Sequence, residues 1–116
     1  MPLGGETYIY GRYTSMKAED IQLSHKIRAS VAIALIGEVV PSLRAIAIDW
    51  SDHRIRTVSY YEGVPTEDDI YLAEIIKNEL REDFGEDWAI TTEVVRRDTP
   101  ANMEPLRSWA FYRKEA

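Results

Sequence analysis

The order of helical and strand-like patterns predicts an α+β fold, with two helices packed on one face of a four-stranded sheet. Apolar residues recur every three or four positions in two segments, which is typical of helices with one buried stripe. Each of these segments is followed by a pair of alternating or β-branched runs, which is typical of strands. The predicted order is therefore α-β-β-α-β-β, with helices near 18–40 and 66–84 and strands near 43–50, 54–62, 88–97 and 108–113.

The first predicted helix is apolar over much of its circumference. One stripe contains Leu23, Ile27, Val31, Ala34, Leu35 and Val39, and a second contains Ala29, Ile33, Ile36 and Val40. Two such stripes mean that the helix packs on two sides, or that one side is left for a partner. Gly37 and then Pro41 are expected to end it.

The middle of the chain predicts a hairpin followed by a well-defined second helix. Residues 51–53 supply a short turn between the first two strands. Thr66 and Asp69 resemble a capping box, and Gly85 is suited to the end of the helix. Strands 54–62 and 88–97 should point the same way, either paired in parallel or separated by another strand.

Length and composition indicate one domain, 18–116, preceded by an N-terminal extension, 1–17, that carries Tyr8, Tyr10 and Tyr13. The chain contains no cysteine, and its formal charge of −6 disfavours binding to nucleic acid. No apolar stretch is long enough to cross a membrane, and the N-terminus does not resemble a secretory signal. We therefore expect a cytoplasmic protein with neither a nucleic-acid nor a membrane partner.

Candidate catalytic and metal-binding residues are few. His25 and His53 have no second histidine or cysteine at metal-ligand spacing, so both are interpreted as surface residues. Asp49, Asp52 and Glu62 lie near one hairpin but match no catalytic spacing. The sequence therefore predicts no enzyme, no metal site and no cofactor.

Negative charge is concentrated around the second helix. Acids at its start are favoured by the helix dipole, but acids at its end are disfavoured by the same dipole, so folding does not explain them. Exposed aromatic residues beside acids are typical of binding surfaces. The predicted partner-binding residues are Glu79, Glu82, Asp83, Glu86, Asp87, Tyr61 and Tyr71.

From about Leu35 onward, the chain resembles small bacterial immunity proteins of contact-dependent growth inhibition and colicin-like toxin systems. The segments that carry the resemblance are Leu43-Arg44-Ala45, Tyr60-Tyr61-Glu62-Gly63, Glu82-Asp83-Phe84, Arg96-Arg97-Asp98 and residues 108–115. The resemblance implies a cytosolic antidote that binds and blocks a cognate toxin domain, for which a basic nuclease is a suitable partner. The alternative is a small scaffold or ligand-binding module, with a homodimer formed through the first helix.

Overall fold

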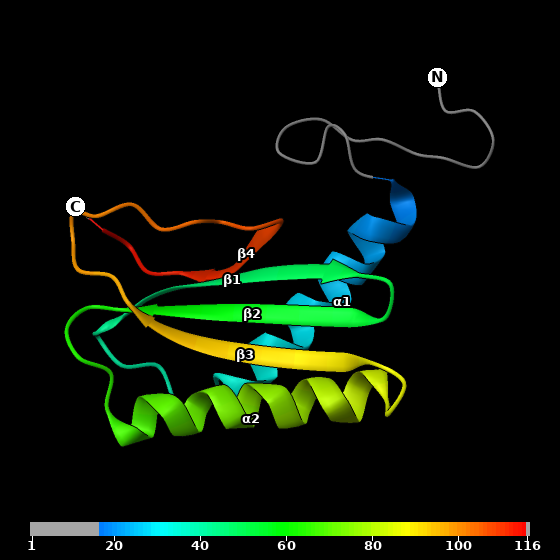
Figure 1. The fold of residues 1–116 in the computed structure, drawn as a ribbon, viewed down its shortest axis with the longest axis horizontal. Coiled ribbons are helices and arrows are strands. Elements are labelled where there is room, and N and C mark those ends of the chain that lie inside the picture. Colours follow the sequence, from blue (N-terminus) through cyan, green and yellow to red (C-terminus); the bar gives the residue numbers. More distant parts are fainter. Residues whose placement is uncertain (1–16, 116) are drawn as a thin grey trace.

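The computed structural model describes residues 17–115 and confirms the predicted element order (Figure 1). Residues 1–16, which make up nearly all of the predicted N-terminal extension, lie outside the described residues. Four strands form one sheet in the order β3-β2-β1-β4. The elements are α1 (Ala18–Ala34), β1 (Leu43–Ser51), β2 (Arg54–Tyr61), α2 (Glu67–Phe84), β3 (Ala89–Arg96) and β4 (Ser108–Tyr112).

The sheet is mixed. β1 pairs antiparallel with both β2 and β4, whereas β2 and β3 pair directly in parallel. This result decides between the two arrangements that the sequence left open. Asp52 and His53 form the predicted hairpin turn with φ angles of 34° and 61°. Two consecutive positive φ angles match the twist of a two-residue hairpin loop.

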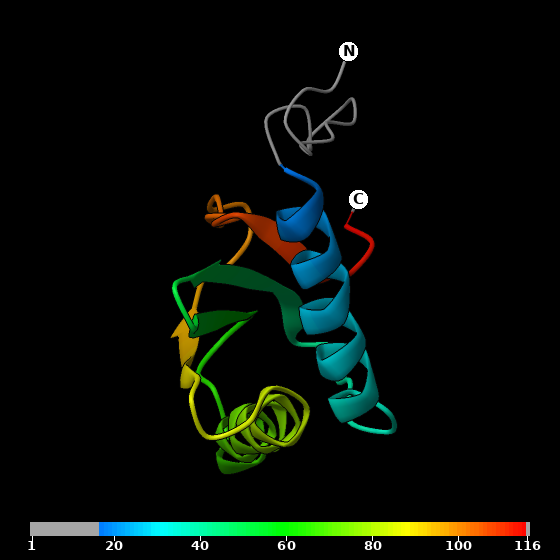
Figure 2. The same ribbon diagram turned by 90° about the vertical axis from the view of Figure 1, so that its right-hand side faces the viewer.

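Both helices cover the same face of the sheet, as predicted. Figure 2 shows α1 running alongside the sheet, with its C-terminal end close to α2. The helix residues Ile27, Val31, Leu72, Ile76 and Leu80 are buried against the sheet. On the other side of this core lie Leu43, Ile46, Ile48, Trp50, Ile55, Tyr61 and Ile90. The Thr66–Asp69 capping box is present, so the start of α2 also agrees with the sequence.

The opposite face of the sheet is covered by the segment 97–107, which the sequence suggested only as a connecting loop. Ala45, Ala47, Val58 and Tyr60 are buried there. Met103, Leu106 and Trp109 pack against them. The hydroxyl of Tyr60 donates a hydrogen bond of 3.0 Å to the carbonyl oxygen of Glu104. The β1–β2 hairpin is therefore buried on both faces.

A bulge in β1 directs Arg44 toward this covering segment. Leu43 and Ala45 oppose the consecutive residues Tyr61 and Tyr60, so Arg44 is the extra residue. Its side chain is buried, and it donates hydrogen bonds to the carbonyl oxygens of residues 97 and 101. It also forms a two-bond ion pair with the carboxylate of Glu115, with both distances 2.9 Å. Arg44 thus connects β1, the covering segment and the C-terminal end of the chain.

α1 is shorter than predicted. The sequence extended it to about residue 40, but it ends at Ala34. The amide of Ile36 bonds to the carbonyl oxygen of Ile33, three residues back, and Gly37 has a φ of 75°. This tightened last turn and the positive φ angle lead the chain away from the helix axis. The apolar residues after Ala34 therefore belong to a turn and not to a helix stripe.

We predict that Glu115→Gln destabilises the fold by about 2 kcal/mol at neutral pH, because Arg44 loses a charged hydrogen-bond partner. Hydrogen bonds to Arg44, followed by those to Arg113, lower the pKa of Glu115 from 4.5 to about 2. The stabilisation is therefore complete above pH 4.5 and is lost as the pH falls toward 2. Urea titrations across this range measure the effect. A difference between wild type and variant that does not shrink at acid pH contradicts this assignment.

Candidate functional site

The predicted acidic residues gather at the C-terminal end of α2 and in the turn that follows it. Glu79, Glu82 and Asp83 lie on one stripe of the helix, and Glu86 and Asp87 come after its last residue. All are exposed except Glu79, which is half-buried. The fold therefore brings the predicted acids together on one part of the surface.

Asp83 has a role in folding that the sequence did not reveal. The hydroxyl of Ser30 on α1 donates a hydrogen bond of 2.6 Å to the Asp83 carboxylate. Beside it, the ammonium group of Lys26 lies 4.6 Å from the ring centre of Phe84. These two contacts connect the middle of α1 to the end of α2. The contact between the two helices therefore explains why an acid is present at position 83. Glu82, in contrast, has no hydrogen bond or ion pair within residues 17–115.

Electrostatic repulsion remains within the acidic cluster. The pKa of Glu79 is raised, first by its partial loss of hydration and then by a hydrogen bond with Asp83 and the charges of Asp83 and Glu82. A raised carboxyl pKa means that the charged form is disfavoured in the folded state. Loss of hydration, and after it the neighbouring acids, therefore disfavour the charged form of Glu79 at neutral pH.

The two predicted tyrosines lie in different environments. Tyr71 is 64% exposed on α2, next to the turn after α1, so it is available to a partner. Tyr61 has no exposed surface and belongs to the core between the sheet and the helices. Burial raises the pKa of its hydroxyl to about 12. The prediction that Tyr61 contacts a partner is therefore not supported by its position, and we leave it out of the proposed surface.

A groove with one apolar wall and one acidic wall lies between the turn after α1 and the first half of α2. It has a volume of about 340 Å³, and Val39, Val40, Tyr71 and Leu72 supply its apolar wall. Ile33 and Ile36, which precede the lining residue Gly37 in the chain, are 53% and 76% exposed. The polar lining consists of Gly37, Glu38, Asp68 and Asp69. The sequence placed Ile33, Ile36 and Val40 on a second apolar stripe that was either packed or left for a partner, and the structure leaves all three exposed.

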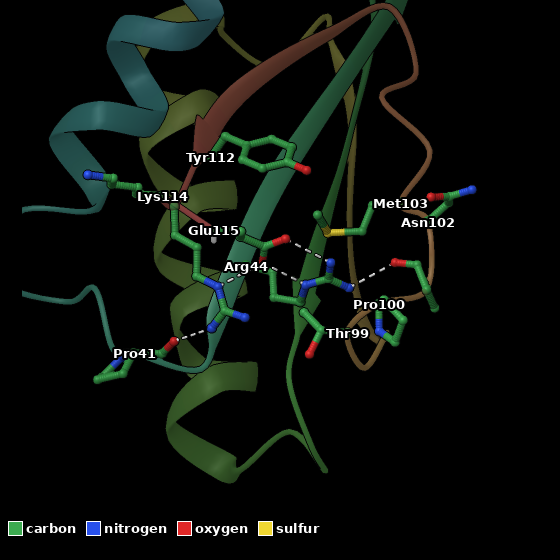
Figure 3. A pocket seen from close by; sticks show the side chains of 11 residues that line it. Pro41, Arg44, Thr99, Pro100, Asn102, Met103, Tyr112, Lys114 and Glu115 are labelled. Atoms are coloured by element: carbon green, nitrogen blue, oxygen red, sulfur yellow. Dashed lines mark hydrogen bonds and ion pairs between the residues drawn. The ribbon is translucent and has the colours of Figure 1, made fainter.

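A larger cavity of about 780 Å³ lies beside the C-terminal residues, where Pro41, Arg44 and the segment 99–103 also line it (Figure 3). The guanidinium of Arg113 donates to the carbonyl oxygen of Pro41 and to the carboxylates of Glu62 and Glu115. Arg44 is similarly committed to Glu115 and backbone carbonyls. Because these charges already neutralise one another, we interpret the cavity as part of the scaffold.

The residues considered for catalysis remain apart. His25 is exposed on α1, and His53 lies in the hairpin turn with its ring centre 4.8 Å from that of Trp88. Glu62 accepts hydrogen bonds from Thr99 and Arg113. Within residues 17–115, no three histidine or acidic side chains are grouped to hold a metal ion.

None of the helices in this part of the chain combines the length and apolarity needed to cross a membrane.

Comparison with protein families matches residues 24–115 to the MafI2 immunity protein family. The matched region begins within α1 and extends through β4, so it includes every element that forms the acidic cluster and the groove. A comparison with curated proteins gives no significant match.

We predict that Glu79→Gln raises Tm by about 2 °C at pH 7, because it removes a charge that is partly dehydrated and is repelled by Asp83 and Glu82. The folded-state pKa of Glu79 lies above its ordinary value of 4.5, so the penalty is present at neutral pH and disappears as the pH falls below 4.5. Thermal melts at pH 7 and pH 4 measure this difference. Equal stabilisation at both pH values contradicts an electrostatic origin.

Proposed function

Because this chain belongs to the MafI2 immunity protein family, we propose that it binds its cognate toxin directly in the cytosol and blocks it without catalysis. Family membership establishes toxin neutralisation as the general function. Direct occlusion is supported by a surface on which acids and exposed apolar side chains lie close together on the helix layer. Contact-dependent delivery of the toxin is part of the same proposal.

A toxin with a basic binding surface, such as a nuclease domain, suits the charge of this protein. The chain has a net charge of −6, and Glu82, Glu86 and Asp87 are exposed at the end of α2. Complementary charge accelerates encounter and orients the partners, while buried side chains supply most of the affinity. The acidic cluster is therefore assigned to steering and not to the main binding energy.

The second candidate is a small dimeric scaffold or ligand-binding module. The exposed Ile33 and Ile36 on and after α1 favour it, because a second copy could bury them. Protection of living cells separates the two functions. An immunity protein rescues cells that express the catalytically competent toxin domain encoded beside its own gene, whereas a scaffold leaves those cells unprotected.

We predict that Glu82→Lys slows association with an inactivated form of that toxin domain by about threefold to tenfold at low salt. The salt dependence of the association rate should also weaken, because fewer steering charges remain to be screened. Stopped-flow mixing at two salt concentrations measures both effects. Glu82 suits this test better than Asp83, whose replacement would also break the bond to Ser30.

The matched control is Glu104→Lys, which changes the net charge equally but lies in the segment that covers the opposite face of the sheet. It should slow association much less than Glu82→Lys does. Equal slowing by both variants would mean that only net charge matters. No slowing by either would remove the acidic cluster from the proposal.

A further inference from the structure

Exposed apolar side chains are unevenly distributed over residues 17–115. Eight large ones are exposed, and most of them lie at one end of the helix layer, where the turn after α1 meets the start of α2. Tyr71, which is 64% exposed, lines the groove, and Ile36, which is 76% exposed, directly precedes the lining residue Gly37. Three of the eight, Val39, Val40 and Tyr71, line one hollow together. Exposed apolar side chains grouped around a hollow are typical of a protein-binding surface, whereas single exposed residues are not informative.

The charges around the groove are of one sign. Glu38 on the turn and Asp68 on α2 line it, and both are exposed. Asp69 also lines it, but its carboxylate is held by the capping box and is buried. Among the described residues, no lysine or arginine lines this groove. An occupant must therefore combine an apolar contact with positive charge at its edge.

The groove and the acidic cluster belong to one surface. Tyr71, Ile75, Asn78 and Glu82 recur at helical spacing, so they form one stripe of α2, and all but the half-buried Ile75 are exposed. This stripe runs beside the residues of α2 that meet α1, because Asp68 and Leu72 line the groove with the turn after α1 and Asp83 bonds to Ser30. At about 1.5 Å per residue, Tyr71 and Glu82 are separated by roughly 16 Å along the helix, which fits within one interface of ordinary size.

We propose that this groove is the docking site for the toxin, which inserts an apolar side chain flanked by lysine or arginine between the turn after α1 and α2. The inference rests on the proposed function and specifies which face carries it. Ile36 and Tyr71 are the anchors, and Glu38 and Asp68 form the acidic rim. The cluster that begins at Glu79 extends this rim along α2.

Two variants test the anchors: Tyr71→Ala and Ile36→Ser. The binding partner is the purified, catalytically inactivated toxin domain against which the wild-type chain protects co-expressing cells. Each variant should raise the dissociation rate at least tenfold and change the association rate little, because buried anchors act mainly on dissociation. Both side chains are exposed, so thermal melts should show that the fold is retained.

Tyr112→Ala is the matched control, because Tyr112 is 50% exposed and lies on β4, beside the polar cavity at the opposite edge of the sheet. It should leave the dissociation rate unchanged. Glu38→Lys should instead slow association, as expected for a rim charge. Dissociation rates that are unchanged in both anchor variants, or raised equally in the control, overturn the docking site while leaving toxin neutralisation intact.

Two further outcomes separate the inference from its premise. If the wild-type chain neither protects cells nor binds the toxin domain, the proposed function fails and the docking site fails with it. If sedimentation shows a dimer that Ile36→Ser converts to a monomer, and the dimer persists when toxin is bound, the groove belongs to a second copy of this chain. A monomer that forms a one-to-one complex with the toxin domain supports the proposal.

Discussion

Burial of both faces of the β1–β2 hairpin is the constraint on which the rest of the structure depends. Residues on alternate sides of β1 are apolar, so the hairpin needs a cover on each face. The helices cover one face and residues 97–107 cover the other. The second cover has no regular structure before β4, and it is held in place by Arg44, whose buried charge is neutralised by Glu115. Removing Glu115 would leave the charge of Arg44 buried without its carboxylate, whereas Glu115 without Arg44 would still be bonded to Arg113.

This arrangement separates the scaffold from the surface available for binding. On the side of residues 97–107, charged groups are committed to one another and to backbone carbonyls. On the helix layer, the early end of α1 leaves Ile36 and its neighbours exposed beside Tyr71. Retaining such an apolar patch exposes the free protein to nonspecific contacts, so its presence is best explained by a partner. In the proposed function, the acids on α2 supply the orientation that apolar contacts alone lack.

Local sequence patterns were sufficient for most of the fold but not for contacts between distant segments. The strands, α2 and its capping box agree with the predicted elements because each depends on residues close in sequence. The predicted end of α1, near residue 40, was wrong. Val39 and Val40 continue the apolar spacing, although the chain has already turned at Gly37. The cover formed by residues 97–107 was not foreseen, since Met103 and Leu106 follow no regular spacing. The Ser30–Asp83 bond joins positions 53 residues apart, and no local pattern indicates it.

The most direct test of this account is hydrogen–deuterium exchange of the full chain with and without the inactivated toxin domain. The account predicts that binding slows exchange in the turn at residues 35–40 and along the first half of α2, and that residues 97–107 exchange as in the free protein. Slowed exchange confined to residues 97–107 or to the C-terminal residues around Glu115 would contradict it, because it would place the toxin on the face assigned to the scaffold.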